Sequence, residues 1–178
     1  MNKVVNTLLL ATMFLVPTSL EAQVVASPID FDCNAGAGKV SVWTTGIRST
    51  GLRMTGTIQF KFLRHHVESA PGAFVYLISK SDVRNGLQLN RHFANLLRAR
   101  IVSTDDPTGH VILTQPWKWD PLPFALTISN SGETNVTIRD KAASLKVNGL
   151  EPASLVLGCS TARVKFSDIV ITSVNGDP

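Results

Sequence analysis

Most apolar stretches of the chain are short, and apolar and polar positions alternate within them, which is typical of β-strands. The clearest case is residues 51–64, where Ile58, Phe60 and Phe62 alternate with polar residues. We expect this segment to form one long, half-buried strand. Further strands are predicted, beyond one near the start of the mature chain, at 74–78, 87–89, 97–101, 111–114, 124–128, 136–138, 145–147, 155–157, 164–166 and 169–171.

Turn-forming residues separate these strands. The pair Asn85-Gly86 is strongly typical of a two-residue hairpin turn, and we expect it to connect the strands on either side of it. The sequence Asp-Asp-Pro-Thr-Gly at 105–109 and the segment 129–133 predict two further hairpins. Residues 90–97 are expected to form either one helical turn or a loop.

The number of strands predicts an all-β, antiparallel fold. A single open sheet would leave one hydrophobic face in contact with water, so the strands must form two packed sheets or one closed sheet. No internal repeat or linker divides the sequence, and its length suits one domain. We therefore expect a single domain over residues 23–178.

The first 22 residues are expected to be an export signal and not a part of the fold. Lys3 precedes the mostly apolar run 4–16, which is shorter than the roughly 20 residues of a membrane span. Pro17 ends this run, and the small residue Ala22 fits a cleavage point. The mature protein is then secreted or periplasmic, and we expect no stable membrane insertion.

The net charge indicates which classes of partner to expect, and the cysteines indicate which strands lie close together. The net charge of +4 weakly favours anionic partners, and secretion argues against nucleic acid. Cys33 and Cys159 are the only cysteines, and an oxidising compartment favours a disulfide between them. In a jelly-roll sandwich the first and last strands are neighbours, and a bridge from the first strand to one near the C-terminus fits that topology.

The C-terminal half combines a tryptophan-containing segment before a hairpin, a leucine-glycine strand and a closing strand of the form Phe-x-Asp-Ile-x-Ile. These features lie at 117–119, 123–129, 137–138, 154–159 and 166–171. In this combination the chain resembles the concanavalin A-like lectin and glucanase superfamily, including its laminin G-like branch. The resemblance implies a two-sheet jelly roll, and it makes carbohydrate the first ligand class to consider.

The sequence shows no complete catalytic or metal-binding constellation. Glucanases of this fold carry alternating carboxylates, because two of them must face the sugar from one side. Asp30 and Asp32 have the spacing to share a strand face but lack a third acid, and we interpret them as solvating residues. His65 and His66 are adjacent, so on a strand they point to opposite faces and cannot chelate together. We predict no catalytic residue, no metal and no cofactor.

Two tryptophans are candidate carbohydrate-binding residues. Trp117 and Trp119 are two positions apart, which puts both rings on one face if the segment is extended. Such a pair could stack on a sugar ring. The alternative is that a tryptophan before the hairpin fills the core.

Four basic residues are the second candidate set. Arg98 alternates with Arg100, and Arg163 alternates with Lys165 on another predicted strand. If the two strands share a sheet, these side chains make a basic face suited to acidic glycans or phosphate groups. The alternative is that alternating charges only keep the wet face of the sheet soluble.

We therefore expect an exported, non-enzymatic β-sandwich module that binds a cell-envelope or extracellular glycan, acidic or neutral. A glycan hydrolase or lyase of the same fold is one alternative. A structural or protein-interaction module is another.

Overall fold

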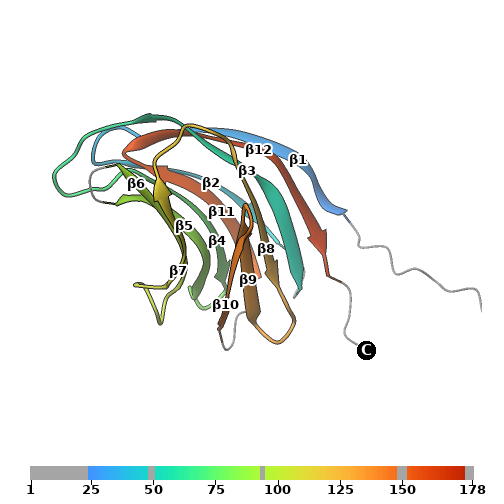
Figure 1. The fold of residues 1–178 in the computed structure, drawn as a ribbon. Coiled ribbons are helices and arrows are strands. Elements are labelled where there is room, and N and C mark those ends of the chain that lie inside the picture. The colour runs from blue at the N-terminus through green and yellow to red at the C-terminus, as the bar shows by residue number, and fades with distance from the viewer. Residues whose placement is uncertain (1–23, 48–50, 93–94, 148–151, 175–178) are drawn as a thin grey trace, which may run out of the picture.

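The computed structural model describes residues 24–47, 51–92, 95–147 and 152–174. Within these residues twelve strands form two antiparallel six-stranded sheets packed face to face, and there is no helix (Figure 1). The predicted all-β sandwich is confirmed. The expected export signal at 1–22 lies outside the described residues. In the described part of the chain, no helix is long and apolar enough to cross a membrane.

Each sheet combines strands that lie far apart in the sequence. In spatial order, sheet A consists of β1 (Val24–Asn34), β12 (Ala162–Ser173), β3 (Leu52–Leu63), β8 (Leu122–Ile128), β9 (Glu133–Ile138) and β10 (Lys141–Lys146). Sheet B consists of β2 (Val40–Gly46), β11 (Pro152–Ser160), β4 (Gly72–Ser79), β5 (Arg84–His92), β6 (Leu96–Ser103) and β7 (His110–Pro116).

The core between the sheets is built from the alternate apolar positions of the strands. On β12, the side chains of Val164, Phe166 and Ile169 are fully buried. A bulge at Asp168 shifts the alternation by one residue, so the predicted separate strands at 164–166 and 169–171 are one continuous strand. Each fully buried large side chain contributes about 1.5–3 kcal/mol to the hydrophobic stabilisation.

The predicted disulfide between Cys33 and Cys159 is present, with its Cα atoms 6.0 Å apart. Cys33 lies on β1 and Cys159 on β11, so the bridge joins sheet A to sheet B across the core. The first and last strands, β1 and β12, are neighbours in sheet A, as the jelly-roll expectation required. At the other side of the sandwich, β7 and β10 contact each other.

The predicted turn at Asn85-Gly86 is wrong, because both residues lie inside β5. The chain turns earlier, where the Ser79 N–H donates to the Val83 carbonyl oxygen at 2.9 Å. Asn85 is fully buried, and its side-chain amide donates a hydrogen bond to the Thr134 hydroxyl of β9 across the core. This contact between the sheets fixes Asn85 in an extended strand, which outweighs its local preference for a turn.

Two of the predicted hairpins are present in the structure. The hairpin from β6 to β7 is confirmed, and the Asp106 carboxylate accepts hydrogen bonds from the Thr108 hydroxyl (2.7 Å) and the Gly109 N–H (2.9 Å). These bonds lower the pKa of Asp106. The hairpin from β8 to β9 is confirmed as well. Within 90–97, the described residues show no helical turn: β5 continues to His92 and β6 begins at Leu96.

Candidate functional site

Sheet B turns one face to the core and the other to solvent, and we call the second the outer face of sheet B. Alternate residues of its strands form this face, and the strand register shows which of them lie directly opposite one another. Three rows cross it: Val40, Ser160, Gly72, Asn90 and Arg98; then Val42, Gly158, Phe74, Gln88 and Arg100; then Thr44, Val156, Tyr76, Gly86 and Val102.

Two glycines shape this face. A Cβ atom at Gly86 would lie 2.0 Å from the Val75 carbonyl oxygen, so the position between Tyr76 and Val102 carries no side chain and stays open. A Cβ atom at Gly158 would lie 2.3 Å from the ring of Phe74. The Phe74 ring therefore rests on the backbone of β11.

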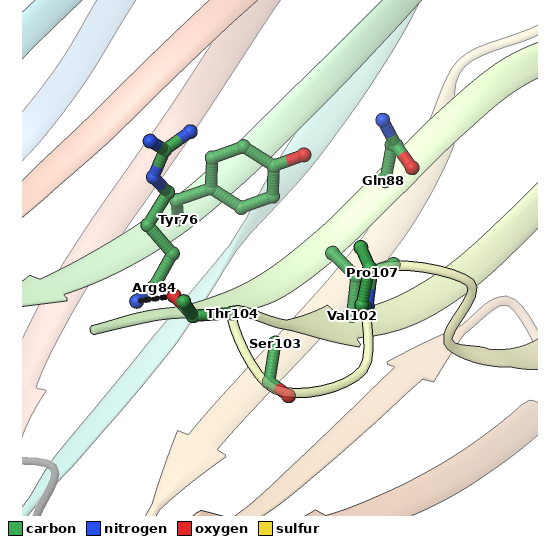
Figure 2. Close-up of a pocket in the computed structure, with 7 residues that line it drawn as sticks. All are labelled: Tyr76, Arg84, Gln88, Val102, Ser103, Thr104 and Pro107. Atoms are coloured by element: carbon green, nitrogen blue, oxygen red, sulfur yellow. Dashed lines mark hydrogen bonds between the residues drawn. The ribbon is translucent and has the colours of Figure 1, made fainter. Parts of the chain in front are cut away.

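Two adjoining cavities occupy the outer face. The first, shown in Figure 2, has a volume of about 310 Å³. The second, about 460 Å³, shares three residues with it and extends over the apolar side chains toward β2. The shared residues are Tyr76, Arg84 and Gln88. The two cavities therefore form one shallow groove with a basic, amide-rich side and an apolar side.

Arg100 lies beside the groove, on β6 directly opposite the lining residue Gln88, and is held in place by two hydrogen bonds. Its Nη2 donates to Gln88 Oε1 at 2.8 Å, and its Nη1 donates to the Thr108 carbonyl oxygen at 2.9 Å. If the Asn90 amide is turned so that its nitrogen donates to the Leu89 carbonyl oxygen, its oxygen also lies 3.2 Å from Arg100 Nη2. All these acceptors are neutral, so the positive charge of Arg100 remains uncompensated.

The outer face carries three arginines, and one acid, Asp82, lines its second cavity. Among the described residues, Arg84, Arg98 and Arg100 have no carboxylate oxygen within 4.0 Å. The six strands of sheet B, over their described bounds, contain neither Asp nor Glu. Nε of Arg98 is buried without a hydrogen-bond partner in this part of the chain. Such a surface attracts anions and offers them charge-assisted hydrogen bonds.

Tyr76 lies at the border between the two sides of the groove. Its ring stacks on that of Phe74, with the centroids 4.8 Å apart and the planes at 18°. Burial raises the pKa of the phenol above its usual value, although the nearby charges of Arg84 and Arg100 act in the opposite direction. The hydroxyl is therefore protonated at neutral pH and can donate a hydrogen bond. Figure 2 shows it pointing away from the Arg84 guanidinium.

The structure separates the four basic residues that the sequence grouped together. Arg98 and Arg100 lie on β6 in sheet B, whereas Arg163 and Lys165 lie on β12 in sheet A. The expected single basic face is therefore wrong, because its condition, a shared sheet, is not met. Arg163 also pairs with Asp32 at 2.6 Å, which lowers the pKa of that carboxyl group. Its charge is largely compensated.

The two tryptophans differ in their surroundings. Trp117 packs edge-on against the core residue Phe60, with ring centroids 4.7 Å apart, whereas the side chain of Trp119 is 50% exposed. The two indole rings lie 6.0 Å apart with their planes at 74°. They do not form one flat stacking surface: Trp117 packs against the core and is only partly exposed, whereas Trp119 is half exposed.

The acidic pair on β1 has structural contacts in sheet A. Asp32 forms the ion pair with Arg163, and a carboxylate oxygen of Asp30 accepts a hydrogen bond from the Asp168 N–H at 3.1 Å. Neither residue belongs to the outer face of sheet B. Among the described residues, no group of three or more His, Cys, Asp or Glu side chains could hold a metal ion.

The sequence reasoning missed Tyr76, Arg84 and Gln88. Gln88 and Asn90 do alternate with leucines, and this spacing could have placed both amides on a solvent face. The turn predicted at Asn85-Gly86 hid this signal. It placed a turn near the residue at which β5 begins in the structure, Arg84.

Comparison with known proteins shows the fold. No protein-family model and no curated protein sequence matches the chain. Among solved structures, an alginate lyase from Pseudomonas aeruginosa superposes with a TM-score of 0.53 at 12% identity, over 69% of this chain and 64% of its own. This chain thus spans less than two thirds of that enzyme.

Two further structures cover more of their own length. The carbohydrate binding module CBM66 from Bacillus subtilis has a TM-score of 0.50 at 10% identity, over 86% of this chain and 98% of its own. The VIP36 exoplasmic/lumenal domain, in a Ca²⁺/Man-bound form, has a TM-score of 0.55 at 8% identity, over 88% and 83%. The fold is of the concanavalin A-like lectin and glucanase type. At these identities the likeness shows the fold alone.

Proposed function

We propose that this protein is an exported carbohydrate-binding module and that the outer face of sheet B binds an acidic glycan. The observation that carries the proposal is the set of three arginines, Arg84, Arg98 and Arg100, that lie beside an aromatic pair on a sheet without strand carboxylates.

The two sides of the groove match the two kinds of surface on an acidic sugar. The apolar C–H face of the ring packs against Phe74 and Tyr76, as ligands do on the aromatic lining of binding sites. The amides of Gln88 and Asn90 supply hydrogen bonds to hydroxyl groups. Arg100 pairs with the acidic group, because a guanidinium held in position matches the geometry of a carboxylate.

The comparisons and the disulfide support this proposal. The similar structures include a carbohydrate binding module, a domain in a mannose-bound form and an alginate lyase. The Cys33–Cys159 bridge is typical of proteins in oxidising compartments, in line with a secreted or periplasmic protein whose residues 1–22 are removed. The remaining 23–178 then act as one binding domain.

A lyase is the second candidate function at the same face. A uronate lyase removes the proton next to the carboxylate and expels the glycosidic oxygen, which leaves a C=C double bond; it needs a neutralised carboxylate and proton-transfer groups. Arg84 and Arg100 could neutralise the carboxylate, and the protonated Tyr76 could donate its proton to the expelled glycosidic oxygen, while a base from solvent takes the abstracted proton. Hydrolysis by a carboxylate pair is disfavoured here, because Asp82 is the single carboxylate among the described lining residues of the groove.

Calorimetric titration with uronate-containing, sulfated and neutral oligosaccharides of matched length tests the proposal. We expect uronate or sulfated chains to bind and their affinity to fall as salt is added, because screening weakens exposed charge pairs. No binding by any acidic chain, or binding of acidic chains that does not weaken as salt is added, would contradict the proposed site. Release of unsaturated sugars from the same mixtures, seen as an increase in ultraviolet absorbance, would assign the lyase function.

A further inference from the structure

A third cavity, with lining residues of its own, lies at one end of the sandwich. Its volume is about 410 Å³, and its lining comes from the last residues of β3, the end of β5, the residue before β6 and the segment that follows β7. It shares no lining residue with either cavity of the outer face. We call it the end pocket; its lining residues are Phe62, Leu63, Arg91, Asn95, Trp117 and Trp119.

Two large aromatic side chains of the end pocket are exposed to solvent. Phe62 is 55% exposed and Trp119 is 50% exposed, although most large apolar residues of the described chain are buried. The guanidinium of Arg64 lies 5.4 Å from the centre of the Phe62 ring. The Phe62 ring therefore already has a cation beside it, whereas no cation–π contact is found for the half-exposed Trp119 ring among the described residues.

Trp119 is held in place by contacts that lead back to the core. Its ring contacts that of Trp117 edge-on, and Trp117 in turn contacts the buried ring of Phe60. The Trp119 carbonyl oxygen also accepts a hydrogen bond from Gln59 Nε2 at 3.0 Å. An exposed ring that is already fixed loses little conformational entropy when a ligand binds to it.

Polar groups complete the end pocket. Nη2 of Arg91 donates to Asn95 Oδ1 at 3.3 Å, which places a guanidinium and an amide in the same lining as the rings. The indole Nε1 of Trp117 is buried without an acceptor among the described residues. A pocket in which three of the six lining residues are aromatic, with a few hydrogen-bonding groups, suits a ligand that has an apolar face and a polar rim.

We propose that the end pocket is a second carbohydrate site, in which one pyranose ring of a neutral sugar stacks on Trp119. Asn95 and Arg91 then hydrogen-bond its hydroxyl groups. Stacking and not charge provides most of the affinity, since one of the six lining residues is charged and Asn95 engages its guanidinium. This site is chemically distinct from the basic groove on sheet B, and its test does not depend on whether the groove binds a glycan.

Calorimetry with neutral hexose and N-acetylhexosamine oligosaccharides tests the end pocket. We expect Trp119→Ala to weaken the binding of neutral sugar by about tenfold or more, as the loss of a central aromatic anchor does. Trp119→Phe should retain most of the affinity, because it keeps a ring. Lys118→Ala is the matched control, since Lys118 is an exposed neighbour outside the lining.

Measuring the binding of both ligand classes by each variant distinguishes the two proposed sites. Trp119→Ala should leave acidic-glycan binding unchanged, and Arg100→Ala should leave neutral-sugar binding unchanged. The end-pocket proposal is overturned if no neutral sugar binds the wild-type protein. It is also overturned if neutral-sugar binding survives in a folded Trp119→Ala variant or depends on Arg100.

Discussion

Replacing Arg100 by alanine is expected to remove most of the affinity for acidic oligosaccharides, by about tenfold to a hundredfold. A hydrogen bond to a charged group is worth roughly 1.5–3 kcal/mol, and Arg100 offers such bonds from a guanidinium that Gln88 and Thr108 already hold in place. Calorimetric titration of both proteins at low and at physiological salt measures the change. Arg100→Lys should be intermediate, because it keeps the charge but not the fork geometry.

Lys165→Ala is the matched control for this prediction. It removes the same unit of charge from an exposed position on β12, in the sheet that does not carry the groove. We expect its affinity for acidic oligosaccharides to stay within about twofold of the wild type, because exposed and distant charges are screened. Equal losses in Arg100→Ala and Lys165→Ala would show that attraction to the net charge, and not a site on sheet B, causes the binding.

The double variant Cys33→Ala/Cys159→Ala is expected to lose roughly 5 kcal/mol of unfolding free energy. The bridge closes a loop with a sequence separation of 126 residues, and the chain-entropy model gives about this value for such a loop. Since a domain of this kind is stable by about 5–15 kcal/mol, the variant should be near the limit of folding. Urea unfolding followed by circular dichroism measures the difference.

Reduction of the wild-type protein provides the control for the disulfide prediction. A reducing agent should lower the urea midpoint of the wild type toward that of the double variant and should leave the variant unchanged. A loss of less than about 1 kcal/mol would mean that the unfolded chain gains little freedom when the bridge is removed, contrary to the chain-entropy account.

The strands and the disulfide could be predicted because their signals are local or unique. In β3, the alternation of Ile58 and Phe60 with polar residues is enough to indicate a strand with one buried face. The cysteine pairing needed no geometry, because the chain has two cysteines. The resemblance to a jelly roll then gave the correct relation between the first and last strands.

The sheet to which each strand belongs could not be predicted, because it depends on partners far away in the sequence. Arg98 with Arg100 and Arg163 with Lys165 have the same spacing, yet β6 and β12 lie in different sheets. The turn signal at Asn85-Gly86 failed for a similar reason. A hydrogen bond to Thr134, on a strand of the opposite sheet, keeps Asn85 in β5.

The candidate site could not be predicted from the sequence, because the residues of its apolar side lie in a segment that is apolar throughout. Within 74–78 every residue is apolar or aromatic, so alternation does not distinguish the core-facing Val75 and Leu77 from the outer-face Phe74 and Tyr76. A segment that is apolar on both faces resembles a strand buried on both sides. The structure shows instead that Phe74 and Tyr76 form one side of the groove.

The claim that acidic glycans bind to the outer face of sheet B is tested most directly at Tyr76, which is the only tyrosine in the chain. Incorporation of fluorotyrosine therefore places a single fluorine NMR signal in the groove. We predict that an acidic oligosaccharide shifts this signal with the same saturation curve as the heat of binding, and that the shift is absent in Arg100→Ala at the same ligand concentration. Saturable binding of the acidic oligosaccharide that leaves the Tyr76 signal unchanged would contradict the account.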